Sequence, residues 1–481
     1  MNAMRLGGWC LVLCLGSLPL WADETPTAEQ LQRQARDAVY GCSRSRGGKV
    51  AELRRVGPAA LDALFALQTE MAAKAPHLRP NDPNRTDDDP TAEELAAVAE
   101  HTRRTNILRE VIDAVGSQRD CSASGLYWYT DLEAAKAAAM KSQKPILSLR
   151  MLGNLTDDLS CANSRFFRTT LYANHQVAEA LRNRFVLHWQ SVRPVPIVTI
   201  DFGDGRKLVR TVTGNSAHYV LDPQGRVVDA LPGLYGPRAF LIRIGAAEAL
   251  VHFLNKYPRH DDWTRAVAAW HAQELERTQQ AWRKELQNLE TAAAQPARPA
   301  SPQQAFLQQA APQQAAPPRA AAAARLARPK QRAERVILAA ATLEAAGPPD
   351  ANTSDELWAK IALAHAADAE LDPASRALIS SKLPPAGAAG ELAVTKAIVE
   401  MPLVRVVRSL QQAIALDTVK NEYLLHRKIH EWLAAAPDTA LDELNERVYA
   451  ELFLTPGSDP WLGLLPADGY TALENGGVVA K

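Results

Sequence analysis

The stretch from residue 131 to residue 164 constrains the fold most, because a helical pattern, a buried-strand pattern and a second helix start follow one another there. Residues 131–142 are amphipathic, and residues 144–152 form an apolar run typical of a buried strand. Cys161 and Ser164 then stand at the start of the next helical pattern. Backbone N–H groups and the helix dipole stabilise a thiolate at such a position. The pattern therefore indicates a redox-type site in an α/β segment.

Three short motifs follow Cys161 in the chain. They are Val-Ala at 177–178, Phe-Val at 185–186, and a hairpin pattern with an Asp-Pro-x-Gly turn at residues 214–228. In these motifs residues 125–257 resemble the thioredoxin-like superfamily, particularly its secreted members. The resemblance implies a central α/β domain with a mixed sheet and catalytic roles for Cys161 and Ser164 in thiol–disulfide exchange.

Two residues depart from the pattern of that family. Ser164 stands where the family has its resolving cysteine, and Ser216 stands where the family has a cis-proline, so Asn215 and Ser216 are the residues expected to line the substrate groove. A serine hydroxyl cannot attack a mixed disulfide to release product. We therefore do not expect ordinary dithiol turnover from this Cys-x-x-Ser site.

The length and composition indicate several domains. A chain of 481 residues exceeds a single core. Residues 291–330 are rich in alanine, glutamine and proline and lack large apolar groups, which is typical of a flexible linker. We predict an α+β multidomain protein in which the thioredoxin-like domain is flanked by helical regions. The predicted parts are a signal peptide (1–22), a helical N-terminal region (24–122), the thioredoxin-like domain (125–257), a long helix (258–290), the linker (291–330) and a helical C-terminal domain (331–481).

The amino-terminal segment predicts export to the periplasm or the medium. Arg5 precedes an apolar stretch, residues 6–21, which ends at the small residue Ala22. No later stretch is apolar over the length of a membrane span, so we expect none in the mature chain. With 54 basic and 54 acidic residues the net charge is zero, which argues against nucleic-acid binding.

Three cysteines remain after removal of the predicted signal peptide. In an oxidising compartment thiol pairs tend to close. We predict a disulfide between Cys42 and Cys121, because these two bracket the N-terminal helices and leave Cys161 free. The alternative pairing, Cys121 with Cys161, would leave no free thiol at Cys161.

Several histidines compete for chemical roles. Glu422, His426 and His430 recur every four residues, so on a helix they share a face and could hold zinc. Because no further ligand is evident, we predict exposed or hydrogen-bonded histidines, with no metal and no cofactor. His175 or His188 would lower the pKa of Cys161 if either faced the sulfur, although a core position for His188 fits the pattern as well.

Two hypotheses for function follow. In the first, Cys161 acts as a lone thiolate that forms mixed disulfides with a partner protein or a small thiol. In the second, the fold has lost its chemistry and serves as a scaffold that binds other proteins of the cell envelope. The sequence carries no signal for an oligomeric state.

Overall fold

The computed structural model describes residues 26–76, 91–211, 213–257, 259–294, 353–382 and 396–462, together with residues 349, 464 and 478. The predicted signal peptide and all but the first four residues of the predicted linker lie outside this part of the chain.

The N-terminal region is helical, as the sequence predicts. Thr27 and Gln30 form a reciprocal capping box at the first helix, and the apolar faces of these helices build a core of their own around Leu64 and Ile112. The helices are α1 (Ala28–Tyr40), α2 (Ser43–Val56), α3 (Pro58–Ala73), α4 (Ala92–Gly116) and the short α5 (Cys121–Ser124).

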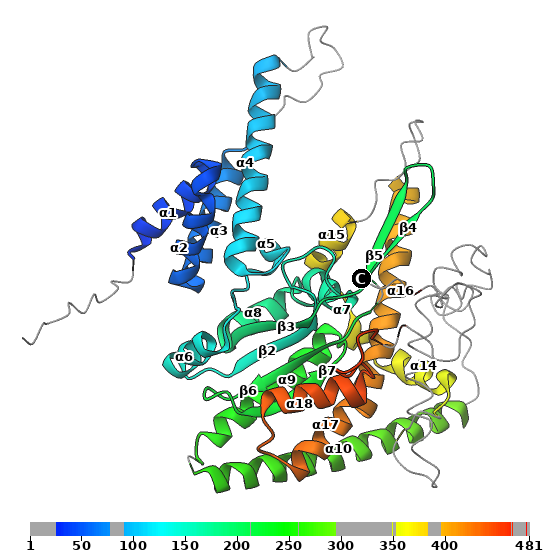
Figure 1. The fold of residues 1–481 in the computed structure, drawn as a ribbon. Coiled ribbons are helices and arrows are strands. Elements are labelled where there is room, and N and C mark those ends of the chain that lie inside the picture. Colours follow the sequence, from blue (N-terminus) through cyan, green and yellow to red (C-terminus); the bar gives the residue numbers. More distant parts are fainter. Residues whose placement is uncertain are drawn as a thin grey trace, which may run out of the picture.

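A mixed five-stranded sheet forms the centre of the molecule (Figure 1). Its strand order is β1-β3-β2-β6-β7, with β1, β3 and β2 parallel and with β6 and β7 antiparallel to their neighbours. All seven residues of β2 are buried, which explains its continuous apolar run in the sequence. The strands are β1 (Trp128–Tyr129), β2 (Ile146–Leu152), β3 (Val186–Arg193), β6 (Ser216–Leu221) and β7 (Val227–Pro232).

The sheet is connected through helices that begin at capping residues. Asp131 caps the helix between β1 and β2, and Asn174 caps the second helix between β2 and β3. On two successive residues of β6, His218 contacts Phe240 and Tyr219 contacts Asn445, so the two faces of the sheet meet different helices. The connecting elements are α6 (Leu132–Ser142), α7 (Ala162–Phe166), the π-helical turn η1 (Phe167–Leu171), α8 (His175–Arg184) and α9 (Pro237–Leu254).

A separate hairpin extends away from the sheet, and the alternating residues around the turn at residues 203–205 predict it over residues 195–213. Strands β4 (Ile197–Asp201) and β5 (Lys207–Thr211) pair in antiparallel register and form a two-stranded ribbon apart from the main sheet (Figure 1). Ile197 and Phe202 are more than half exposed.

The C-terminal helices do not form one independent domain. Residues of α17, α18 and η4 share the core of the central sheet, whereas α14, α15 and α16 build another core around Trp282 and Trp358. The long helix runs four residues beyond the predicted end at 290, and none of the described helices is both long and apolar enough to cross a membrane. These elements are α10 (His260–Ala294), α14 (Asp355–Ala364), η2 (Ala366–Ala369), α15 (Pro373–Lys382), α16 (Lys396–Lys420), η3 (Asn421–His426), α17 (Arg427–Ala435), α18 (Leu441–Arg447) and η4 (Val448–Leu452).

Candidate functional site

Cys161 stands at the amino end of a helix, as its sequence pattern predicts. It is the residue before α7, and the backbone N–H of Ser164 donates to its sulfur across 3.4 Å. The sulfur nevertheless does not face solvent, because Cys161 is fully buried. A lone thiolate that forms mixed disulfides needs a sulfur that partners can reach, and this position does not provide it.

The Ser164 hydroxyl is directed away from the thiol. It donates to the hydroxyl of Ser160 across 2.7 Å, and both side chains are fully buried. Ser164 thus supports Cys161 through its backbone N–H, while its side chain organises the preceding loop.

Asn215 and Ser216 do lie next to the start of α7. The Asn163 amide donates to the Ser216 hydroxyl across 3.0 Å, and the backbone N–H of Ala162 donates to the Thr213 carbonyl across 3.0 Å. Gly214 permits this approach, since a Cβ atom there would stand 2.5 Å from the Asn163 side-chain oxygen. The structure thus brings the four predicted site residues into one region, built from the start of α7 and the start of β6.

The place where a substrate groove is expected is covered by the chain itself. We call residues 448–462 the C-terminal segment. The Tyr449 hydroxyl donates to the Asn215 carbonyl across 3.2 Å, and the Asn215 amide donates to the Thr455 hydroxyl across 2.9 Å. Asn215 and Ser216 are consequently buried, so the expected open groove is absent here.

Arg193 holds the C-terminal segment in place. From the end of β3, its guanidinium donates to the carbonyl oxygens of Thr455 and Asp459, at 2.7 and 2.9 Å, and to that of Pro456 at 3.3 Å. Charge-assisted hydrogen bonds of this kind are stronger than neutral ones.

Burial determines the electrostatics of the thiol. It raises the pKa of Cys161, and the backbone N–H groups of Ser164 and Leu152 offset that effect only in part. Burial likewise raises the pKa of Tyr449, whose hydroxyl lies in the same environment as the sulfur. The direction is opposite to the one that a helix start alone favours, so Cys161 is a neutral thiol in this arrangement.

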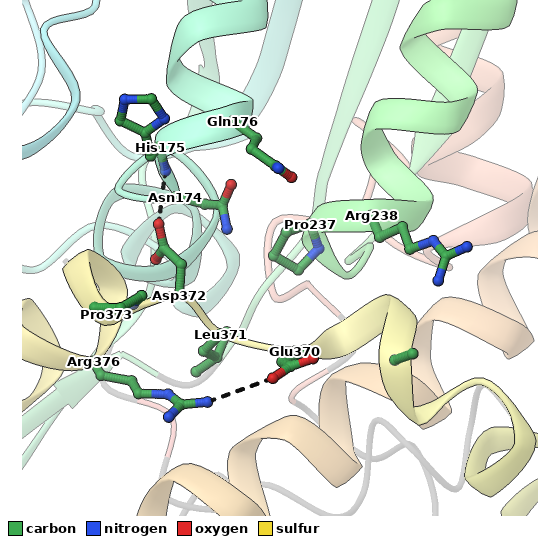
Figure 2. A pocket seen from close by; sticks show the side chains of 11 residues that line it. Asn174, His175, Gln176, Pro237, Arg238, Glu370, Leu371, Asp372, Pro373 and Arg376 are labelled. Carbon is green, nitrogen blue, oxygen red and sulfur yellow. Dashed lines mark hydrogen bonds and ion pairs between the residues drawn. The ribbon is translucent and has the colours of Figure 1, made fainter.

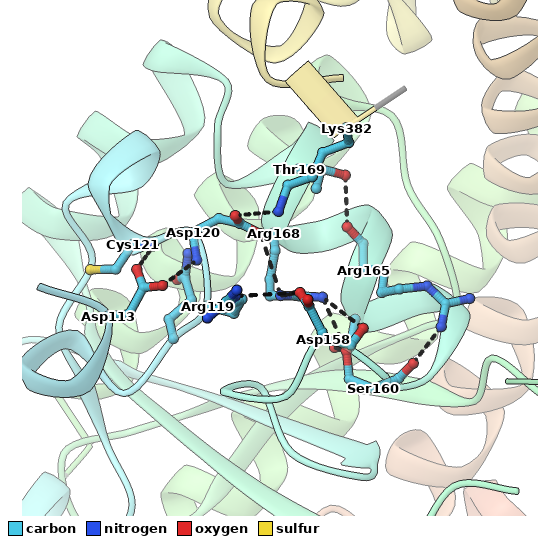
Figure 3. A network of polar contacts seen from close by, with 12 residues as sticks. Asp113, Arg119, Asp120, Cys121, Asp158, Ser160, Arg165, Arg168, Thr169 and Lys382 are labelled. Carbon is cyan, nitrogen blue, oxygen red and sulfur yellow. Dashed lines mark hydrogen bonds and ion pairs between the residues drawn. The ribbon is translucent and has the colours of Figure 1, made fainter. Parts of the chain in front are cut away.

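A buried polar network joins the loop before Cys161 to both helical regions (Figure 3). Arg168 is 2% exposed and donates to Asp120 across 3.3 Å and to the Asp158 carbonyl across 3.4 Å. Lys382 of α15 donates to the other Asp120 oxygen across 2.6 Å. On the N-terminal side, Asp113 accepts the backbone N–H of Cys121 across 2.8 Å. The loop is therefore held from two sides.

The predicted disulfide between Cys42 and Cys121 is not present. All three described cysteines are free thiols. Cys42 is exposed before α2, whereas Cys121 is fully buried and its thiol donates to the Leu126 carbonyl across 3.4 Å. The rival pairing of Cys121 with Cys161 is absent as well.

Neither histidine near the motif is shown to activate the thiol. His175 has an exposed side chain, 3.9 Å from Glu179, at the start of α8. His188 is buried, and its Nδ1 lies 2.8 Å from the Ser148 hydroxyl. Burial, assisted by Arg150, lowers the pKa of His188 to about 4, so it is a neutral, hydrogen-bonded core residue.

His426 and His430 are buried rather than exposed. The Nε2 atom of His426 lies 2.9 Å from a carboxylate oxygen of Asp229 on β7. The Nδ1 atom of His430 lies 2.8 Å from Nδ1 of His271 in α10. Sequence reasoning missed Asp229 and His271. No local spacing marks them, because each lies more than 150 positions from the helix that carries the other two.

A cavity of about 700 Å³ opens elsewhere, between the starts of α8 and α9 and the connection from α14 to α15 (Figure 2). Asp372 accepts the backbone N–H of His175 across 2.8 Å, and Arg376 lies 3.9 Å from Glu370. The lining residues do not include the predicted site residues.

Comparison with known proteins gave no match to a family model, to a curated protein or to a solved structure.

Proposed function

We propose that residues 125–257 form a thioredoxin-like domain of an exported protein. The support is the topology: three parallel strands and two antiparallel strands in the order β1-β3-β2-β6-β7, with a cysteine at the start of the helical connection between β2 and β3. The predicted signal peptide remains the basis for expecting export.

We infer further that this domain works as a binding scaffold and not as a thiol–disulfide oxidoreductase. The observation that carries this proposal is the burial of the Cys161 sulfur beside a groove filled by the C-terminal segment. A buried thiol with a raised pKa supplies little thiolate, which is the reactive form. Because position 164 is a serine, no resolving thiol follows Cys161 that could release a mixed disulfide.

The β4–β5 hairpin is the surface we assign to a partner protein. Within the described residues it pairs with no further strand, and it exposes Ile197, Val198 and Phe202. Unpaired strand edges can add a strand from another chain, and neighbouring apolar side chains then supply contact area. An extended segment of another envelope protein fits this chemistry.

Thiol exchange is the second candidate, and one observation favours it. The backbone N–H of Ser164 already points at the sulfur, which is the arrangement that stabilises a thiolate once water reaches it. In this alternative the C-terminal segment lifts, Cys161 attacks a disulfide of a partner protein or small molecule, and a mixed disulfide forms as one thiolate leaves.

Reaction with oxidised glutathione separates the two candidates, and the chain carries its own control. Cys42 is exposed and Cys161 is buried in the same molecule. The native full-length protein is incubated with oxidised glutathione, and peptide mass spectrometry measures the glutathione adduct at each cysteine. We expect the adduct at Cys42 and none at Cys161, because the disulfide cannot reach the buried sulfur.

A glutathione adduct at Cys161 that forms as fast as the one at Cys42 would overturn the scaffold proposal and support thiol exchange.

A second measurement addresses the partner surface. Replacing Phe202 by serine is expected to weaken capture of envelope proteins by the immobilised chain, whereas serine at the partly exposed Phe253 of α9 serves as the matched control.

A further inference from the structure

Three buried side chains from distant parts of the chain lie close together between β7, α10 and α17. Asp229 lies on β7, His271 on α10 and His430 on α17, and each is at most 1% exposed. One potential ligand atom from each lies within 4.8 Å of the other two. We propose that Asp229, His271 and His430 bind a divalent transition-metal ion of the zinc type.

The hydrogen bonding of His271 prepares one of its nitrogens for a metal. Its Nε2 lies 3.0 Å from the Val228 carbonyl oxygen, which can only accept, so Nε2 carries the hydrogen. The lone pair of neutral His271 is consequently on Nδ1, the atom that faces His430 across 2.8 Å. A backbone carbonyl that fixes the far nitrogen is the usual outer partner of a metal-binding histidine.

His430 presents the second nitrogen. Its Nδ1 faces Nδ1 of His271, while its Nε2 has no hydrogen-bond partner among the described residues. Two imidazole nitrogens that face each other require a proton or a cation between them. A metal ion held by the two Nδ1 atoms would take the place of that proton.

The surroundings of the three side chains are compatible with a cation. His271 and His430 are buried, and burial favours the neutral imidazole, which is the form that binds metals. Asp229 already faces one cation, because its carboxylate pairs with His426 across 2.9 Å. Arg243, a second cation near the cluster, is hydrogen-bonded to Glu422 across 2.9 Å and also pairs with Glu274.

Zinc is the metal class that this donor set fits best. Two imidazoles and a carboxylate are among its common ligands, at about 2.0–2.2 Å from the ion. Three protein ligands leave the fourth position of a zinc ion to a water molecule. Because all three side chains are buried, we assign the ion a structural role, in which it would join the sheet, the long helix α10 and the C-terminal helix α17. This role is independent of the function proposed for the Cys161 region.

The test is metal binding by the full chain, purified on an affinity tag that contains no histidine. The protein is stripped with a chelator and titrated with zinc chloride, and bound metal is measured by inductively coupled plasma mass spectrometry. We expect about one zinc ion per chain and a rise in Tm on loading. Asp229→Asn and His271→Gln should remove both responses.

His218→Gln is the matched control. His218 is equally buried, and it interacts with the Tyr172 hydroxyl across 2.6 Å outside the cluster. It should therefore retain zinc even if its Tm is lower. The proposal is overturned if the folded wild-type chain binds no zinc, or if folded Asp229→Asn and His271→Gln bind it as the wild type does. Should those variants not fold, the wild-type titration decides alone.

Discussion

Two opposing effects act on the Cys161 sulfur. Its place before α7 directs backbone N–H groups at the sulfur and favours the thiolate, whereas complete burial favours the neutral thiol. The raised pKa shows that burial dominates. The sequence predicts the helix start because it is a local pattern. It does not predict the burial, because Tyr449 and Thr455, which cover Asn215, come more than 230 positions later.

Asp120 pairs with two cations of the buried network, Arg168 and Lys382. Replacing it by asparagine removes the carboxylate nearest to the buried Arg168 guanidinium, leaves only Asp158 at 3.9 Å, and also removes the pair with Lys382. Breaking a buried pair from one side costs about 3 kcal/mol, so the free energy of unfolding in urea should fall by that amount. Glu100→Gln, at exposed pairs with Arg103 and Arg104, is the control and should cost much less. Equal losses in the two variants would contradict the network described here.

His365 gives a pH-dependent prediction. Partial burial alone would lower its pKa, but hydrogen bonds to Asp368 and Glu285 outweigh this effect and raise the pKa. A raised pKa in the folded state means that the stabilisation is complete below the unfolded value of about 6.5 and is lost as the pH rises through the folded value.

The wild type should therefore exceed His365→Gln in stability by about 1 kcal/mol at acidic pH, with the difference shrinking at alkaline pH. Chemical denaturation at several pH values measures it, and exposed His260→Gln is the control. A difference that grows with pH would contradict the assignment.

At the scale of elements, local patterns predict well and long-range packing does not. The capping box at Thr27, the β4–β5 hairpin and the start of α9 at Pro237 all follow from short-range signals. The grouping of the C-terminal helices does not follow, because α17 and α18 join the core of the sheet while α14 and α16 pack around Trp282. Amphipathic periodicity shows that a helix has a buried face, but it does not show which partner covers that face.

Arg193 tests the role of the C-terminal segment. Arg193→Gln removes the charge from three contacts to the carbonyl oxygens of this segment. If the substitution destabilises the closed position of the C-terminal segment by about 1.5 kcal/mol, the fraction of molecules in which this segment has opened rises about tenfold. Alkylation of Cys161 by iodoacetamide should accelerate accordingly, as measured by peptide mass spectrometry. Arg206→Gln, at the exposed tip of the hairpin, should leave the rate unchanged.

At the scale of the whole molecule, the chain after the predicted linker returns to the central sheet. The Asn421 amide donates to the Leu234 carbonyl across 2.7 Å, and the Thr418 hydroxyl accepts the backbone N–H of Gly236 across 2.8 Å. α10 and α17 also pack against each other. The sequence composition predicts the position of the linker. It does not predict these contacts, because they join residues that lie on opposite sides of the linker in the sequence.

Limited proteolysis tests this arrangement. We expect the first cleavage within the part of the predicted linker that follows α10, residues 295–330, because its sequence is rich in alanine, glutamine and proline and lacks large apolar groups. The two fragments should nevertheless elute together in size-exclusion chromatography, since the shared core holds them. Fragments that separate without denaturant would contradict a common core.

The Cys161 thiol is buried, and the neighbouring Asn215 is covered by the chain's own C-terminal segment, so pH-dependent alkylation of the native protein is the most direct test of its accessibility. The rate at Cys161 is followed by mass spectrometry, with exposed Cys42 as the reference in the same sample. We predict that Cys161 reacts far more slowly than Cys42 at every pH and titrates above the ordinary pKa of a free thiol, about 8.5. Rapid alkylation of Cys161 with a pKa below that value would contradict the account.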